Sequence, residues 1–136
     1  MEKMNKTQWM ELIPEGGGNF FTAGYQISRK VDIMAAMDAL DVFKALSNET
    51  RLKILELLKD PASHFHLESG VDMERVGVCV GEICRVTGLT QSTVSVYLSQ
   101  LEKAGLLEST RIGKWTYYRR DKDAFKRIAD YVRDNL

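Results

Sequence analysis

The apolar residues between positions 90 and 105 repeat at the spacing of an α-helix, and they constrain the fold more than any other feature of the chain. Val94, Leu98 and Leu101 fall on one side of such a helix at about 100° per residue. Thr90 precedes them, and threonine is favoured at a helix start because its hydroxyl accepts a hydrogen bond from the first turn. We therefore expect a helix that follows Thr90 and buries one apolar stripe.

A shorter helix is expected immediately before this one, over residues 81–86. Thr87 and Gly88 separate the two helices, and glycine tolerates the left-handed backbone that commonly ends a helix. The sequence therefore predicts a helix, a short turn and a second helix in succession.

The outward face of the second helix has an unusual composition. It carries short hydroxyl side chains and glutamine where an ordinary solvated helix carries lysine and glutamate. Such side chains can approach base edges and phosphates in the major groove of DNA. The alternative is a Ser/Thr-rich surface helix without a function. The residues of this face and its flanks are Gln91, Ser92, Thr93, Ser95, Val96, Ser99 and Gln100.

The periodicity then changes from helical to strand-like. Residues 106–110 and 115–120 are rich in β-branched and aromatic side chains and flank a turn that contains glycine, which indicates a β-hairpin. Arg111 and Lys114 would lie at its tip, where two cations can meet phosphates or a narrow minor groove. Helix, turn, helix and basic-tipped hairpin is the order of a winged helix-turn-helix. We predict a mainly α-helical (α+β) chain with a small β-hairpin wing.

The remaining residues are assigned more coarsely. Residues 1–30, with their triple glycine, are treated as a partly flexible arm, and residues 31–136 as one DNA-binding and dimerisation domain. Ser47 and Asn48 indicate a break and a helix cap. Further helices are expected over residues 31–46, from Thr50 onward and over residues 123–136, with a long loop at residues 60–78.

Three segments of the chain resemble the ArsR/SmtB family of metalloregulatory repressors. They are FKALSNETRLKILELL, LTQSTVSVYLSQLEKAGLL and GKWTYYR, and they follow one another in the order and spacing of the family. The resemblance covers residues 31–136. It implies a homodimer built from the first and last helices, which binds an inverted-repeat operator in double-stranded DNA until a ligand or a chemical modification releases it.

The resemblance also implies which side chains contact DNA. Tyr97 stands where the family commonly has histidine, so a phenol replaces an imidazole at that position. The complete set expected at the DNA is Gln91, Ser92, Thr93, Ser95, Tyr97, Ser99, Arg111 and Lys114.

A sensing site is suggested by the segment GVCVGEIC, which resembles the ELCVCDLC of arsenic- and metal-sensing members. Cys79 and Cys84 match the first and third cysteines, and Gly81 replaces the middle one. Arsenite prefers three sulfur ligands, and two residues five apart on a continuous helix lie about 140° apart. The pair can converge only if Cys79 precedes the helix.

His64 and His66, in the loop ahead of the cysteines, are further candidate ligands. Three interpretations stay open. The cysteines could hold a thiophilic ion such as As(III), Zn or Cd, with ligands added from the loop. They could instead sense oxidants or sulfur species. They could also be buried packing residues in a regulator with another inducer or none.

Composition excludes several classes of protein. No apolar run approaches the roughly 18 residues of a membrane span, and the absence of a secretory signal, with only two cysteines, favours the cytoplasm. No glycine-rich phosphate motif is present, so an enzyme is not expected. The net charge is zero, yet eight Lys/Arg against four Asp give +4 over residues 111–136. The remaining alternative is a winged-helix module that binds another protein and no operator.

Overall fold

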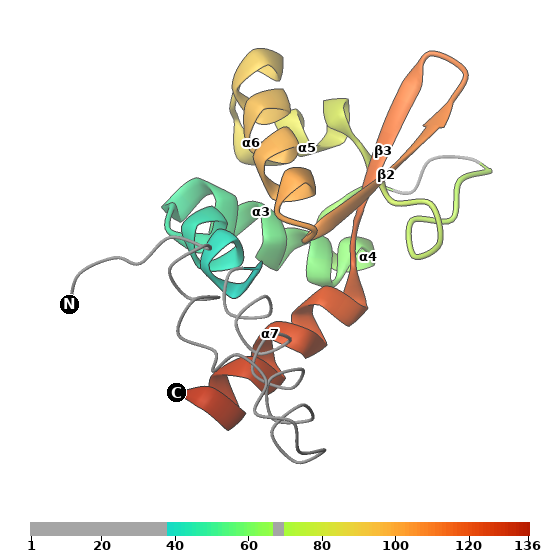
Figure 1. Cartoon of the computed structure of the whole chain (residues 1–136). Coiled ribbons are helices and arrows are strands. Elements are labelled where there is room, and N and C mark those ends of the chain that lie inside the picture. The colour runs from blue at the N-terminus through green and yellow to red at the C-terminus, as the bar shows by residue number, and fades with distance from the viewer. Residues whose placement is uncertain (1–37, 67–69) are drawn as a thin grey trace, which may run out of the picture. The chain divides into compact units, whose positions relative to one another are not determined.

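The computed structural model describes residues 38–66 and 70–136. By its internal contacts the chain divides into Met1–Leu40 and Asp41–Leu136, and the second unit carries the elements discussed below (Figure 1). Residues 41–46 are helical, as predicted. The arm predicted at residues 1–30 and the predicted helical residues 31–37 lie outside the described residues, and the boundary at residue 30 stays a prediction.

Helix α3 (Glu49–Lys59) begins after the predicted break. The Oδ1 atom of Asn48 accepts a hydrogen bond from the backbone N–H of Arg51 at 2.9 Å. This bond satisfies one of the amides that have no intrahelical partner at a helix start. The buried side of α3 carries Ile54, Leu55, Leu57 and Leu58. The helix predicted from Thr50 onward is thus confirmed.

The segment predicted to be a loop, residues 60–78, contains regular structure at both ends. Helix α4 (Pro61–His64) starts at the proline, and strand β1 (Val78–Cys79) pairs antiparallel with the wing. The prediction was wrong at Pro61 because proline is favoured in the first turn of a helix, where its missing N–H costs no bond. It missed β1 because two residues are too few to show a strand period.

Helices α5 (Val80–Thr87) and α6 (Gln91–Lys103) form the predicted helix-turn-helix. Gly88 ends α5 in the left-handed region, with φ +72°, and its N–H donates to the Cys84 carbonyl at 2.8 Å. The side chain of Thr90 caps α6 by accepting from the N–H of Thr93 at 3.3 Å. Glycine and threonine therefore fix the turn as the sequence predicts.

Strands β2 (Leu107–Ile112) and β3 (Trp115–Arg120) form the wing, and the sheet order is β1-β3-β2. Ile112 pairs with Trp115, so the turn is confined to Gly113 and Lys114. Gly113 has φ +60°, and no described residue other than glycine has a positive φ. A two-residue turn with glycine first is the type II′ connection that matches the twist of a hairpin.

Helix α7 (Lys122–Asn135) follows the wing, and the Oδ1 atom of Asp121 caps it by accepting from the N–H of Ala124 at 3.1 Å. α6 and the tip of the β2–β3 hairpin lie toward one end of the second unit, and α7 lies toward the other (Figure 1). Among the described helices, none is both long enough and apolar enough to span a bilayer.

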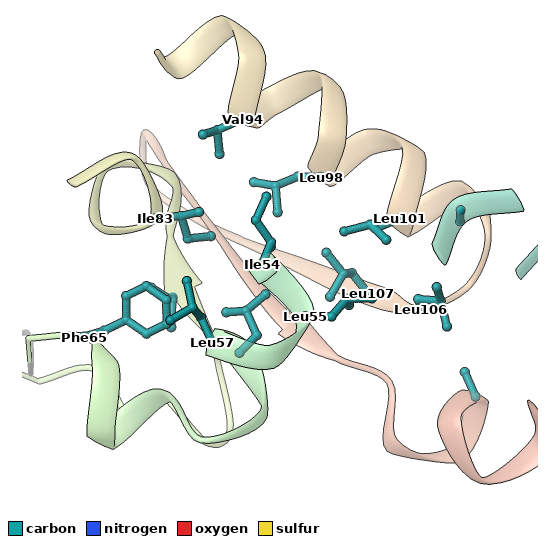
Figure 2. Packing of buried hydrophobic residues seen from close by; sticks show 14 of the residues in the cluster. Ile54, Leu55, Leu57, Phe65, Ile83, Val94, Leu98, Leu101, Leu106 and Leu107 are labelled. Atoms are coloured by element: carbon teal, nitrogen blue, oxygen red, sulfur yellow. The ribbon is translucent and has the colours of Figure 1, made fainter. Parts of the chain in front are cut away.

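The core lies between α3, α5, α6 and the start of β2. Figure 2 shows Ile54 of α3 between the side chains of Ile83 and Leu98, with Leu101 and Leu107 next along the cluster. The largest fully buried side chains are Ile54, Ile83, Val94, Leu98, Leu101 and Leu106. The stripe predicted on α6 is thus fully buried, and its opposite face is left to solvent.

Candidate nucleic-acid interface and cysteine pair

The outward face of α6 is exposed along its whole length. Four of the predicted DNA contacts are exposed there, namely Gln91, Ser92, Ser95 and Ser99. Val96 lies among them with 55% of its surface exposed, and an apolar side chain there can contact a thymine methyl group. This face therefore presents amide, hydroxyl and methyl groups on a rigid helix.

The start of α6 favours an anion. Its first turn contains no acidic residue, so no side chain offsets the partial positive charge of the helix N-terminus. Thr93 is half-buried, and its hydroxyl accepts from the Thr90 hydroxyl at 2.9 Å. The hydroxyl of Ser92 also lies 3.2 Å from the hydroxyl of Thr90. Thr93 therefore belongs to the cap, while Gln91 and Ser92 remain at the surface.

Tyr97 differs from the other predicted contacts. Its side chain is half-buried and packs against the core, and the guanidinium of Arg51 lies 5.7 Å from its ring centroid. A contact between the Tyr97 hydroxyl and DNA stays a prediction. Sequence reasoning missed Arg51 altogether, because no local pattern connects it with a helix 46 residues further on.

Both predicted wing cations are exposed at the hairpin tip. The Nε atom of Arg111 donates to the Gly113 carbonyl at 3.2 Å, and Lys114 Nζ lies 5.2 Å from the ring centroid of Trp115. Trp115 is 55% exposed and was not among the predicted contacts, although its place beside a basic turn is visible in the sequence. Further down the wing, Arg119 pairs with Glu108 at 2.6 Å, which leaves the tip with its own two cations.

Cys79 and Cys84 take up different positions around the start of α5. Cys79 is buried and extended, with φ −73° and ψ 155°, and is both the last residue of β1 and the cap of α5. Cys84 is half-buried within the helix, and both residues carry thiols. Cys79 thus precedes the helix, which is the condition set by the sequence for the two to converge.

The two histidines do not join these cysteines in one site. His64 ends α4 and is exposed. His66 lines a pocket of about 10 Å³ together with Cys79 and Glu82, but neither His64 nor Cys84 lines it. Over residues 38–66 and 70–136, no three His, Cys, Asp or Glu side chains come together as ligands for a metal ion. The donor set in this conformation therefore does not fit a three-coordinate thiophilic ion.

Glu82 holds the segment beside this pocket. Its Oε2 atom accepts from the backbone N–H of His66 at 3.1 Å, and its carboxylate pairs with Arg85 at 2.9 Å. The hydrogen bond from Arg85 lowers the pKa of Glu82 below its ordinary value, and the bond from His66 adds to this effect. The end of α4 is therefore tied to α5 one turn after Cys79.

Comparison with known proteins identifies the family. Residues 75–109 match the family model of the bacterial regulatory proteins of the arsR family. An uncharacterized HTH-type transcriptional regulator of Bacillus subtilis, YbzH, is 49% identical over 100 residues, which cover 74% of this chain and all of that protein. The arsenical resistance operon repressor of Escherichia coli is 30% identical over 86 residues, 63% of this chain and 62% of the repressor.

A solved structure agrees with this assignment. The homodimeric winged helix-turn-helix DNA-binding domain of a possible ArsR-family regulator from Mycobacterium bovis has a TM-score of 0.53 and 28% identity, and the match covers 88% of this chain and 90% of that domain. The family consists of transcriptional regulators and not of enzymes. This chain is a winged helix-turn-helix protein of the ArsR family of DNA-binding transcriptional regulators.

Proposed function

We propose that this protein is a repressor that binds an inverted-repeat operator as a homodimer and leaves it when its two thiols are oxidised. The observation that carries the DNA-binding part is the exposed face of α6, where short polar side chains follow a helix start without an acidic residue. Gln91, Ser92 and Ser95 would contact base edges and phosphates in the major groove. Arg111 and Lys114 would contact the backbone from the wing.

The surface of α7 supports a dimer. Within α7 only Ala124 is buried, while Phe125 and Ile128 are half-buried against the core and Val132 is 43% exposed. An apolar stripe that stays partly exposed on one protomer can pack against the same stripe of a second protomer. The Mycobacterium bovis domain is homodimeric. A two-fold axis would bring two α6 helices to successive major grooves, about 34–36 Å apart, and so require a palindromic site.

We propose thiol oxidation as the signal because a disulfide needs only the thiols of Cys79 and Cys84, whereas among residues 38–66 and 70–136 no three donor side chains come together for a metal ion. Cys79 is the cap of α5 and Cys84 its fifth residue; five residues of helix rise about 7.5 Å, whereas a disulfide rarely tolerates Cα atoms more than about 7 Å apart. Bond formation would therefore deform the start of α5, the helix that contacts α6. The two thiols would lose two protons and two electrons to a peroxide or polysulfide, which is reduced.

The operator tests the first part of this proposal. Duplexes selected from a random pool by the reduced protein should share an inverted repeat, and footprinting upstream of its own gene should protect two half-sites. If the protein selects no sequence and leaves no footprint in any redox or metal state, it is not an operator-binding repressor. Such a result would favour a winged-helix module that binds another protein.

A further inference from the structure

The side chain of Arg51 joins three separate parts of the second unit. It lies in the first turn of α3, and its Nε and Nη2 atoms donate to the carbonyls of Ala45 and Lys44 at 2.6 Å and 3.2 Å. Those carbonyls belong to the last turn of the helix that ends at residue 46, where carbonyls lack the partner that the helix interior provides; the carbonyl of Lys44 also accepts from the N–H of Ser47 at 3.2 Å. A cation at this helix end also meets the negative end of the helix dipole.

The third nitrogen of the same side chain reaches the recognition helix α6. Arg51 Nη1 donates to Gln100 Oε1 at 2.9 Å, and the guanidinium faces the ring of Tyr97 at 5.7 Å. Tyr97 is the middle residue of α6 and Gln100 lies near its end, whereas the predicted contacts Gln91, Ser92 and Ser95 fall in the first half. Arg51 therefore contacts α6 at its middle and near its end, beyond the turns that carry these three residues.

The helix bound by Arg51 also contacts α7. The rings of Phe43 and Tyr131 have centroids 6.4 Å apart at an interplanar angle of 57°. Phe43 directly precedes Lys44, whose carbonyl Arg51 binds. Contacts therefore run without a gap from α7 through residues 43–45 and Arg51 to Tyr97 and Gln100.

We propose that Arg51 is a positioning residue that fixes the tilt of α6 relative to α7, and with it the alignment of two recognition helices in a dimer. Its planar guanidinium sends three N–H groups in three directions, and the ammonium group of lysine cannot reproduce that fork. A small tilt of α6 would displace Gln91 and Ser92 from the base edges, and displacements of about 1 Å are enough to weaken a preorganised site. The inference rests on the proposed DNA-binding function.

The test compares Arg51→Lys and Arg51→Gln with Lys53→Ala. Lys53 lies on the same helix, is exposed and pairs only weakly with Glu56 at 3.8 Å, so its removal matches the loss of charge in Arg51→Gln. The dissociation constant is measured from 50 to 200 mM salt for the selected operator and for a random duplex of equal length, alongside the melting temperature and the sedimentation of each variant.

Both Arg51 variants should bind the operator about tenfold more weakly than the parent, because hydrogen bonds to a charged group are lost. Their affinity for the random duplex and their salt slope should equal those of Lys53→Ala. Operator binding as tight as that of Lys53→Ala would overturn the inference. So would an equal loss on both duplexes with a salt slope lower by about one, since Arg51 would then bind a phosphate directly.

Variants on α6 keep the inference testable if the Arg51 variants fail to fold. Tyr97→Phe keeps the ring that faces Arg51, whereas Tyr97→Leu and Gln100→Ala each remove one contact with it. Operator affinity should fall about threefold from the parent in Gln100→Ala, and about threefold from Tyr97→Phe in Tyr97→Leu, a comparison in which any contact of the Tyr97 hydroxyl with DNA cancels. Parent-like binding by Gln100→Ala together with equal binding by Tyr97→Leu and Tyr97→Phe would refute the inference. If the parent protein itself selects no operator, the proposed function fails first and this inference with it.

Discussion

The outward face of α6 and the start of α5 lie on adjacent helices, yet their functional side chains have opposite surroundings. Gln91, Ser92 and Ser95 are exposed on a helix that is capped by Thr90 and held from behind by a fully buried stripe. Cys79 is buried at a junction between a strand and a helix, and Cys84 is half-buried. Under the proposed function, the first surface would bind DNA without rearrangement, whereas the second would form a bond only through a movement of its backbone.

This contrast extends to the backbone around each region. Gly77 has φ +111°, and a Cβ atom there would overlap the carbonyl group of Tyr118. The chain just before β1 therefore passes too close to β3 for any side chain at position 77. The pairing of Cys79 with Tyr117 then places Cys79 at the edge of the wing. A movement at Cys79 would be transmitted to both the wing and α5, the two elements that flank the recognition helix.

The largest loss of operator affinity should follow from splitting the proposed dimer, because this separates the two copies of α6. Val132→Asp places a charge on the apolar stripe of α7, where burial without a partner is costly. We expect a monomer in sedimentation at micromolar concentration and a loss of operator affinity of at least about a hundredfold, because the second half-site no longer adds its binding. Val132 suits this test better than Ile128, which packs against the core of its own protomer.

Asn135→Asp is the matched control for this change. It adds the same charge to the last turn of α7, where the residue is exposed and bonds only to the Tyr131 carbonyl at 3.1 Å. This variant should remain a dimer. A Val132→Asp protein that sediments as a dimer and binds the operator normally would show that α7 is not the interface.

The preformed character of the α6 face predicts a loss that depends on DNA sequence. Gln91→Ala should weaken operator binding by about 1–3 kcal/mol, the usual range for one base contact, and leave binding to a random duplex unchanged. Gln91 has no hydrogen bond in the cap of α6 that the change would break, unlike Ser92. Dissociation constants for both duplexes decide the result, and equal losses on the two would argue against base recognition by this residue.

If the start of α5 must move when a disulfide forms, release from the operator should require both cysteines. Oxidation of the parent protein by peroxide or polysulfide should lower operator affinity about tenfold, a shift of about 1.4 kcal/mol. Cys79→Ser and Cys84→Ser should bind like the reduced parent before and after oxidant. Mass spectrometry should show the loss of two hydrogens in the parent alone.

Arsenite, zinc and cadmium provide the competing treatments in the same release assay. We expect them to leave the operator complex intact, since the described residues assemble no third ligand near the pair. Release by a metal that both serine variants resist would replace oxidation with metal binding as the signal. If no agent releases the parent, the cysteines serve only in packing.

The features that the sequence could predict are those held by interactions between residues close together along the chain. The caps at Asn48, Thr90 and Asp121 bind amides three residues away, and the buried stripe of α6 repeats within two turns, so a local pattern is sufficient to find them. The II′ turn of the wing depends on one glycine. The fold and the exposed face of α6 could therefore be predicted almost completely.

The rest depends on residues that meet only after folding. Arg51 and Gln100 are 49 residues apart, and the backbone of His66 bonds to a glutamate 16 residues later. Strand β1 exists because β3 provides its partner, and its two residues have no period of their own. Whether Cys79 precedes α5 or belongs to it was decided by that pairing, which no spacing of cysteines could reveal.

A smaller effect is expected at the tip of the wing, where the contact would be to phosphate. Lys114→Ala should weaken operator and random duplex alike by a few-fold and reduce the slope of log affinity against log salt by about one. Lys53→Ala, which removes a charge far from the wing in sequence, should leave the slope unchanged. A loss of affinity for the operator alone would instead indicate that Lys114 contributes to base recognition, the role proposed for Gln91.

The smallest effect concerns the tie between the end of α4 and α5. Glu82 bonds to Arg85 and to the backbone of His66, and these bonds lower its pKa in the folded state below the ordinary value of 4.5. A depressed pKa means that the carboxylate stabilises the fold above about pH 4.5 and that this stabilisation is lost as the pH falls through the folded-state pKa. Because the Arg85 side chain is 46% exposed, solvent screens the pair and the contribution should be modest.

Glu82→Gln tests this tie and its bearing on the thiols. At pH 7 the variant should unfold at a slightly lower denaturant concentration than the parent, and the difference should shrink as the pH is lowered below 4.5. Since His66 and Cys79 line the same pocket as Glu82, loosening the tie should also speed the reaction of Cys79 with a thiol reagent at neutral pH, measured in the Cys84→Ser background. Lys53→Ala should change neither the pH dependence of the denaturant midpoint nor the rate of thiol modification. If Glu82→Gln leaves the rate of thiol modification unchanged, the segment after α4 does not cover Cys79, and access to the thiol is controlled by the movement of α5 alone.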